Sequence, residues 1–266
     1  MFTDSHCHLD RVDLRPYGGD FSIFLQQTRA AGVGRMLCAG IDLDRYPGML
    51  DLVEGREDIF ISVGVHPNEP DRRTPEPEEL VELARHGQNV AIGETGLDYF
   101  HSKGDLDWQQ QRFRNHIRAA KLCAKPLIIH TREAREDTIR IMREEGAEQV
   151  GGVMHCFTEN WAMAEQALEM GFYISFSGIV TFKTAEDLRE TAKRVPLERI
   201  LIETDCPYLA PVPHRGKPNE PKYVALVAQC LADLRQMPLQ DMMEQTNQNF
   251  DRLFLNFFIC ASSNGP

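Results

Sequence analysis

Short apolar runs rich in Val and Ile recur along the whole chain, and patterns typical of helices fill the intervals between them. Each interval is long enough for one helix and two short loops, so the repeating unit is a strand followed by a helix, as in a parallel sheet. The predicted strands are 2–8, 35–41, 60–66, 90–94, 126–130, 152–155, 172–179 and 200–205. Eight such units in 266 residues, with no linker between halves, favour a single (β/α)8 TIM barrel, an α/β fold, over a doubly wound open sheet.

Helix start and stop signals support the same division of the chain. The predicted N-caps are Thr74, with Pro75 at the first helical position, Asn160, and Thr184, with Asp187 completing a capping box. Two further helices are expected over about 220–234 and 239–254, after the eighth strand. We therefore expect the barrel to span 1–257 and to be followed by a tail over 258–266.

The formal net charge of −11 excludes a global basic field that would attract nucleic acid or an anionic membrane. A polyanionic substrate would have to be held locally, by metal ions or by a few basic loop residues. The seven cysteines include no CxxC pair, which is typical of reduced thiols. We see no signal peptide before the first strand and no apolar run long enough to span a bilayer, so we expect a cytoplasmic protein without a membrane partner.

The segment "TDSHCHLD", residues 3–10, gives the first predicted strand an unusual polar face. Asp4, His6, His8 and Asp10 alternate with Thr3, Ser5, Cys7 and Leu9, so in an extended strand the four charged or ionisable side chains share one side. A lone histidine is more often a solvated or hydrogen-bonded residue than a metal ligand. Two imidazoles two residues apart on one face can bind one ion together, which favours a metal site.

Four more apolar runs end on a possible metal ligand. Because parallel strands end on the same face of a barrel, these side chains and the two first-strand histidines would meet at its mouth. Each alone could be a satisfied polar residue at a strand end. Together they form a set large enough for two divalent ions, with the two oxygens of Glu94 able to bridge them. The set comprises His6, His8, Glu94, His130, His155 and Asp205.

The blocks around these residues occur in a fixed order along nearly the whole chain. They read "DSHCHLD", "VGVHP", "AIGETGLD", "PLIIHTRE", "HCFT" and "ETDCPYLAP" followed by "RGKPNEP". This series resembles that of the TatD family of metal-dependent hydrolases, which belongs to the amidohydrolase-like barrel superfamily. The resemblance implies a divalent-metal deoxyribonuclease that degrades DNA from 3′ to 5′, with single-stranded DNA or 3′ ends as substrate.

The resemblance also implies how the ligands divide. One ion would be held by His6, His8, Glu94 and Asp205, and the other by Glu94, His130 and His155. By donor type the ions could be zinc or manganese, whereas the resemblance points to magnesium. His66, at the end of the third predicted strand, is expected either to contact a substrate phosphate or leaving group or to support a ligand. The other histidines, His86, His101 and His116, are expected to face solvent.

Asp205 is the candidate general base, because a carboxylate beside an activated water can take its proton and pass one to the leaving oxygen. Arg132 and a basic loop after the eighth strand are candidates for binding phosphate; the loop residues are His214, Arg215 and Lys217. A loop of this composition is as often a solvated connection, and Asn219 and Glu220 could instead cap a helix that has Pro221 in its first turn.

Three other functions stay open at this stage. The chain could be another hydrolase of the same superfamily, opening a cyclic amide, a lactone or a small phosphoester. Members that bridge their metals with a carboxylated lysine fit poorly, because Lys125 stands at the beginning of its strand. A phosphatase, or a binding protein that keeps the barrel without turnover, are further alternatives. Phe257, Phe258 and Ile259 could pack on the barrel or form an oligomer contact; with no protein partner evident, we expect a monomer.

Overall fold

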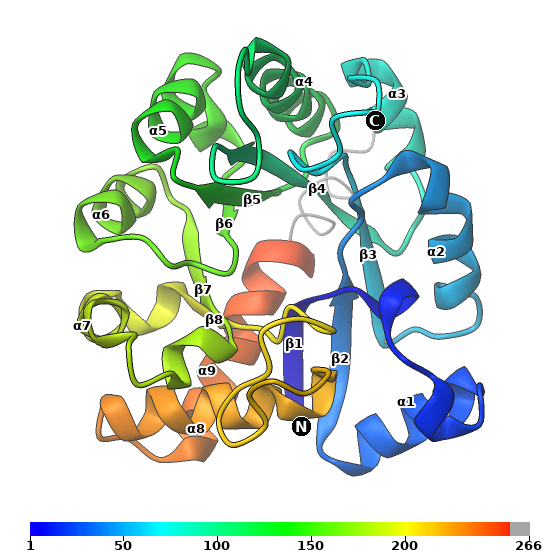
Figure 1. Ribbon diagram of the computed structural model, residues 1–266, viewed down its shortest axis with the longest axis vertical. Coiled ribbons are helices and arrows are strands. Elements are labelled where there is room, and N and C mark those ends of the chain that lie inside the picture. Colours follow the sequence, from blue (N-terminus) through cyan, green and yellow to red (C-terminus); the bar gives the residue numbers. More distant parts are fainter. Residues whose placement is uncertain (256–266) are drawn as a thin grey trace, which may run out of the picture.

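Eight parallel strands follow one another around a ring, each paired with the next along the chain. The computed structural model describes residues 1–255, and the predicted tail, with Phe257, Phe258 and Ile259, lies outside the described residues. Figure 1 shows the ring of strands with most of the helices outside it. This arrangement confirms the predicted barrel and excludes the doubly wound sheet. The strands are β1 (Phe2–Cys7), β2 (Val33–Cys38), β3 (Ile59–Val63), β4 (Asn89–Asp98), β5 (Leu127–Arg132), β6 (Gly152–Met154), β7 (Tyr173–Phe176) and β8 (Ile200–Ile202).

The ring closes between β1 and β8 just beyond the last residue of β8. The backbone N–H of Asp205 donates to the carbonyl of His6 at 3.0 Å, and the N–H of His8 donates to the carbonyl of Cys206 at 2.8 Å. These two bonds fix the chain after β8 against the end of β1. The first and last strands of the barrel are thereby brought together at the mouth.

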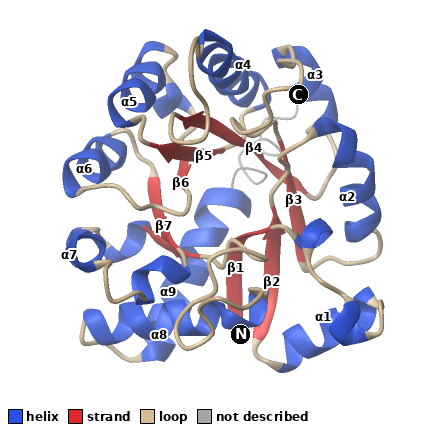
Figure 2. Ribbon diagram, viewed as in Figure 1, coloured by secondary structure: helices blue, strands red, loops and turns tan. Residues whose placement is uncertain are grey.

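An outer layer of helices covers the barrel, as Figure 2 shows. The helices are α1 (Phe21–Ala30), α2 (Tyr46–Val53), α3 (Pro77–Leu83), α4 (Asp107–Cys123), α5 (Arg135–Glu144), α6 (Trp161–Glu169), α7 (Glu186–Arg194), α8 (Val224–Leu234) and α9 (Leu239–Phe250). Shorter helical turns are Leu9–Arg11, Arg15–Tyr17, Leu43–Arg45, Ala147–Gln149, Gly178–Thr181, Leu197–Arg199, Pro221–Tyr223 and the π-helical Asp251–Leu255. Within residues 1–255, none of these helices combines the length and the apolar character needed to cross a membrane.

The predicted helix starts are confirmed at α6 and wrong at α3 and α7. The Asn160 side chain accepts from the N–H of Met163, as a cap should. Helix α3 begins at Pro77 rather than Pro75, because Pro77 holds the preceding Glu76 in an extended conformation. Helix α7 begins at Glu186 without a side-chain cap, so the capping box expected at Thr184 does not form.

At the end opposite the mouth, the inside of the barrel is filled by apolar side chains. Inward residues such as Leu37, Ile128 and Leu201 pack in one cluster with Phe250, Leu253 and Phe254 from α9 and the turn after it. In Figure 1, α9 lies behind the open centre of the ring, where it closes that end. The next inward position, two residues further along a strand, is therefore the first that can hold polar chemistry at the open mouth.

Candidate metal centre

Two residues beyond the apolar layer, the strands present metal-binding residue types to the mouth. His130 follows Ile128 in this way, His155 follows Val153, and Glu203 follows Leu201, with Asp205 two residues further on. On β1, His6 faces the same space, and His8 lies just beyond the end of that strand. Where the strands are regular, their alternation thus places apolar side chains below and metal-binding types above, whereas the pairing of β1 and of β4 is irregular near their ligands.

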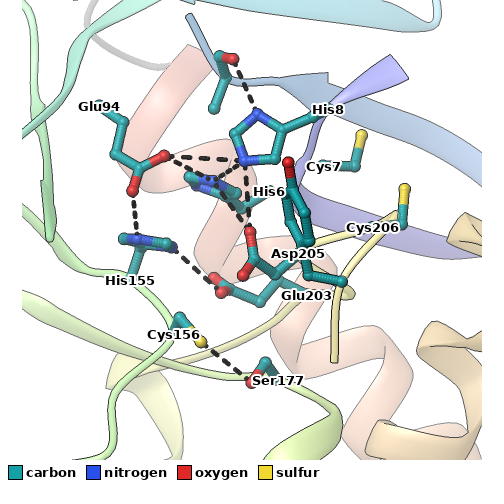
Figure 3. Close-up of polar contacts among 12 residues, drawn as sticks. His6, Cys7, His8, Glu94, His155, Cys156, Ser177, Glu203, Asp205 and Cys206 are labelled. Carbon is teal, nitrogen blue, oxygen red and sulfur yellow. Dashed lines mark hydrogen bonds and ion pairs between the residues drawn. The ribbon is translucent and has the colours of Figure 1, made fainter. Parts of the chain in front are cut away.

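His6, His8, Glu94 and Asp205 converge as one half of the site (Figure 3). The Nε2 atom of His6 lies 3.2 Å from Glu94 Oε2 and 3.7 Å from Asp205 Oδ1. The Nε2 atom of His8 lies 3.3 Å from Asp205 Oδ1. The structure therefore brings together the four residues predicted for the first ion.

The other oxygen of Glu94 faces three further imidazoles. Glu94 Oε1 lies 2.7 Å from His155 Nε2, 3.0 Å from His66 Nε2 and 3.3 Å from His130 Nδ1. The predicted second set, Glu94, His130 and His155, is therefore also assembled. His66 stands in the same half of the site, and its ring nitrogen, Glu94 and His130 lie within 4.8 Å of one another.

The hydrogen bond that His66 accepts distinguishes it from the predicted metal ligands. The backbone N–H of Asn68 donates to His66 Nδ1 at 2.9 Å, so that nitrogen carries the lone pair and a neutral ring carries its proton on Nε2. Burial lowers the pKa of His66 to about 4, which keeps the ring neutral. His66 therefore presents an N–H to Glu94 and to the cavity. That makes it a hydrogen-bond donor rather than a metal ligand.

The remaining donor set fits divalent cations. The Nε2 atoms of His6 and His8 face each other at 3.4 Å, and the Nδ1 of His8 lies 3.2 Å from the carbonyl of Ala39, which can only accept. The His8 proton therefore sits on Nδ1, and its Nε2 lone pair points into the site. Ligand atoms about 2 Å from one ion lie about 3 Å apart, which matches these spacings.

The pKa shifts of the site also indicate that it binds a cation. Burial alone would raise the pKa of Glu94, but His155, His66 and His6 hold it well below its usual range. Burial would lower the pKa of His155, yet Glu94 and Glu203 on either side raise it well above its usual range. Without a metal, a proton on His155 takes the place of the positive charge, so metal binding here competes with protons.

An irregularity in β4 aims Glu94 into the cavity. Between Ile92 and Thr95, β4 uses one more residue than β5 does, which is a β-bulge of the kind found at barrel rims and active sites. Just after it, Gly96 has a φ of 137°, and a Cβ there would stand 1.9 Å from the carbonyl oxygen of His130. Only glycine lets β4 approach the backbone of this ligand so closely.

The polar alternation of β1 holds only for His6 and His8. The pairing of β1 with β2 is irregular between Asp4 and Cys7, and Asp4 pairs with Met36 and clusters with Cys7 and Cys206 on the side of the strand opposite the histidines. There Asp4 accepts from the N–H of Thr204 at 2.9 Å and from the Thr204 hydroxyl at 2.5 Å. Burial raises the pKa of Asp4 to about 8. Asp10 leaves the pattern, because β1 ends at Cys7 and Asp10 belongs to the turn Leu9–Arg11. Its expected place beside the histidines is therefore wrong.

Sequence reasoning missed two buried carboxylates behind the ligands. Asp98, at the end of β4, lies 3.1 Å from His130 Nε2 and 2.9 Å from His101 Nδ1. Burial would raise the pKa of Asp98, but hydrogen bonds from His130, His101 and Asn68 hold it below its usual range. Glu203 lies 3.3 Å from the Nδ1 of His155. Each stands an even number of residues from a predicted ligand in an extended segment, a signal that could have revealed both.

The expectation for the three other histidines is wrong at one position. His86 and His101 are exposed, although His101 contacts Asp98. His116 is fully buried in α4, accepts from the N–H of Val65 at 3.0 Å and lies 2.8 Å from the carbonyl of Arg112. The periodicity of α4 turns this residue toward the barrel, so it is a core histidine with both nitrogens bonded.

The ligands open into a cavity of about 640 Å³ whose wall includes His8, His66, Glu94, His130, His155 and Asp205. Of the four predicted phosphate-binding residues, Arg132 lines this cavity, and its guanidinium lies 4.0 Å from the ring centre of Phe100. The structure does not bring His214, Arg215 and Lys217 into the wall. His214 stacks on Tyr223 at 4.1 Å and Arg215 lies over Phe182 at 4.4 Å.

Asn219 fixes that loop instead of capping the next helix. Its side-chain amide donates to the carbonyls of Thr204 and Tyr208, at 2.8 and 2.6 Å. Pro221 does stand in the first helical turn, as expected. The loop is thereby tied to the segment that carries Asp205.

A parallel barrel with clusters of metal-binding residues at its mouth points to the class of metal-dependent hydrolases, and proteins of that class are similar to this chain. A family model described as TatD related DNase matches residues 3–255, so the chain belongs to the TatD family. It is 47% identical to the uncharacterized metal-dependent hydrolase YcfH of Escherichia coli K12 over 257 residues, 96% of each chain. It is 42% identical to the uncharacterized metal-dependent hydrolase YabD of Bacillus subtilis 168, over 96% of this chain and 99% of YabD. The crystal structure of YjjV, a TatD homologue from E. coli K12, superposes with a TM-score of 0.85 at 28% identity, covering 95% of this chain and 97% of YjjV.

Proposed function

We propose that this metal-dependent hydrolase is a deoxyribonuclease that removes nucleotides from the 3′ end of DNA. The observation that carries the proposal is the placement of Glu94, whose two oxygens face two separate groups of imidazoles and thus suit a pair of ions about one carboxylate. Two divalent ions held there would lower the pKa of a bound water and withdraw charge from a phosphoryl oxygen. The family match adds support for phosphodiester chemistry.

Asp205 is the carboxylate suited to move the proton. Its side chain is 14% exposed, against 3% for Glu94, so it meets solvent and substrate at the cavity floor. His8 and His6 hold its pKa below the usual range against the effect of burial, so it is ionised and can accept. It takes the proton of the attacking water and can return one to the leaving oxygen. His66, with its N–H toward the same floor, donates a hydrogen bond to a phosphoryl or leaving oxygen.

The dimensions of the cavity favour a chain end. About 640 Å³ is the size of a site for a drug-sized ligand, which corresponds to one or two nucleotides rather than a length of duplex. Arg132 provides a cation in the wall, and Arg11 provides another beside Tyr208. We propose single-stranded DNA or a 3′ terminus as the substrate, with its terminal phosphodiester at the ions and the rest of the strand outside.

The few cations in the wall also favour a second candidate, a phosphoesterase for small molecules. The basic side chains of the loop after β8 do not line the cavity, and the chain carries a net charge of −11. Such a site binds one phosphate well and a long polyanion less well. The carboxylated-lysine hydrolases fit poorly, because the ammonium of Lys125 donates to the carbonyls of Ala84 and Asn89, before β5 begins.

The test is digestion of single-stranded DNA labelled at the 3′ or the 5′ end, with Mg²⁺, Mn²⁺ or Zn²⁺ in turn. Wild type should shorten the 5′-labelled strand stepwise and release label from the 3′-labelled strand at once. Asp205→Asn, brought to the same metal content, should do neither. If the protein binds ions but cuts no DNA, while it hydrolyses small phosphoesters such as bis(4-nitrophenyl) phosphate, the second candidate is correct.

A further inference from the structure

Glu203 lies beneath the metal centre, between one histidine from each half of it. It follows β8 by one residue and its side chain points inward, where it is completely buried. The rings of His6 and His155 stack above it, with centres 4.0 Å apart and planes 13° apart. Ligand-type atoms of these three residues all lie within 4.8 Å of one another (Figure 3).

The polar atoms of Glu203, His6 and His155 do not all have hydrogen-bond partners. Glu203 Oε1 lies 3.3 Å from the Nδ1 of His155. The other oxygen, Oε2, and the Nδ1 of His6 are both buried and have no hydrogen-bond partner among the described residues. A buried carboxylate oxygen and a buried ring nitrogen without partners are costly, so two such atoms in one cluster of three residues call for a shared role.

We propose that Glu203 is a positioning residue that accepts the Nδ1 proton of both His6 and His155, and so turns the Nε2 lone pair of each toward the metal centre. One carboxylate then sets the tautomer of a ligand in each half of the site. This inference rests on the two-ion part of the proposed function, and it concerns which atoms hold the ions rather than which substrate is cut.

The neighbouring ligands use the same arrangement with other acceptors. The Nδ1 of His8 lies against the carbonyl of Ala39, and the Nε2 of His130 against Asp98, so each ring has an acceptor behind it and a free nitrogen toward Glu94 or Asp205. Acceptors of this kind fix ring orientation and raise the basicity of a ligand. His6 is the remaining first-strand ligand, and Glu203 Oε2 is the unpaired acceptor beside it.

A third cation held by Nδ1 of His6, Nδ1 of His155 and Glu203 is a poorer interpretation. A neutral imidazole has one lone pair, so a metal on Nδ1 would put the proton of each ring on Nε2. Those two N–H groups would then occupy the space where His6, His8 and Glu94 converge. The ligand set of the main centre would lose two of its four imidazoles.

The direct test is the position of the protons in the zinc-loaded protein. Long-range ¹H–¹⁵N spectra of protein labelled with [¹⁵N]histidine distinguish a ring protonated on Nδ1 from one protonated on Nε2. We expect His6 and His155 both to carry the proton on Nδ1. A proton on Nε2 of either ring would overturn the proposal, and this experiment needs no variant to fold.

Variants test the consequence for metal binding, measured as zinc stoichiometry and affinity in competition with a chelator. Glu203→Gln keeps one acceptor oxygen and should weaken the binding of one ion about 10- to 100-fold, whereas Glu203→Ala removes both acceptors and should weaken both ions. The control is Glu159→Gln, which removes a buried carboxylate paired with Arg135; it should leave zinc binding unchanged.

Equal zinc affinity in wild type, Glu203→Gln and Glu203→Ala would overturn the proposal. None of these readouts involves DNA, so a protein that cuts no nucleic acid could still confirm the role of Glu203. The wild-type titration also counts the ions, which tests the two-ion part of the proposed function separately.

Discussion

Glu94 reaches His155 and His6 with different oxygens, at 2.7 Å from the Nε2 of His155 and 3.2 Å from that of His6. A single carboxylate in the bulged part of β4 thus joins the ligands of β1 to those of β5 and β6. Its neighbours make it an anion at neutral pH despite complete burial. Both halves of the site therefore depend on this residue.

Glu94→Ala should lower metal content and reduce hydrolysis at least about 10³-fold, because the charge stabilisation supplied by bound ions amounts to several kcal/mol. Metal per chain is measured by mass spectrometry of the element, and the fold by circular dichroism. The fold should persist, since the apolar layer below the site does not involve Glu94. A folded variant with full metal content and full activity would contradict the two-ion interpretation.

Arg132→Ala should raise KM about 10- to 100-fold for a DNA substrate and leave metal content unchanged, because a lost hydrogen bond to a charged group costs about 1.5–3 kcal/mol. Arg132 is in the cavity wall, whereas Arg215 stacks on Phe182 outside it. The matched variant Arg215→Ala should therefore change KM much less. A larger effect of Arg215→Ala would mean that the loop after β8 holds the phosphate, as the sequence suggested.

Phe254→Ala should destabilise the protein by about 3–5 kcal/mol, because it opens a cavity in the layer that fills the barrel. Phe254 is completely buried there and packs on Phe250. Chemical denaturation gives the free energy of unfolding, and Leu122→Ala, at a side chain 63% exposed, is the control. Activity per folded molecule should be unchanged, since the metal centre is at the other end. A loss of activity in folded Phe254→Ala would contradict this separation of layers.

The barrel and the assembly of the six ligands could be predicted because both follow from local pattern. The alternation of β-strands carries His130 two residues past Ile128, and parallel strands must end on one face. The same logic would have reached Glu203, which stands two residues before Asp205. Glu203 was missed because the segment "ETD" places two carboxylates on one face of the chain, and only Asp205 was assigned a role.

Other features could not be predicted, because they depend on contacts between distant segments. The bonding of His66 to the backbone of Asn68 decides its tautomer, and no sequence pattern specifies a ring proton. The position of the Arg215 side chain depends on its contact with the ring of Phe182 in another loop. The start of α3 differs for a local reason instead: of two prolines at 75 and 77, the second restricts the residue before it.

The burial of His116, which the sequence was expected to leave in solvent, makes the stability of the protein depend on pH. Burial lowers its pKa from the ordinary 6.5 to about 4, so the folded protein keeps the ring neutral while the unfolded chain protonates it below about pH 6.5. The unfolded state then binds the extra proton, so this contribution to stability is complete above pH 6.5 and is lost as the pH falls toward 4. Between pH 7 and pH 5 the loss should be about 2 kcal/mol.

The measurement is the free energy of unfolding of wild type and His116→Gln across this pH range, with metal removed by a chelator. Glutamine can still donate to the Arg112 carbonyl and accept from the Val65 N–H, but it does not titrate. The difference between the two proteins should therefore shrink or reverse by about 2 kcal/mol on acidification. The matched control is His86→Gln, at an exposed position. Parallel curves for wild type and His116→Gln would show that His116 is not held neutral by the fold.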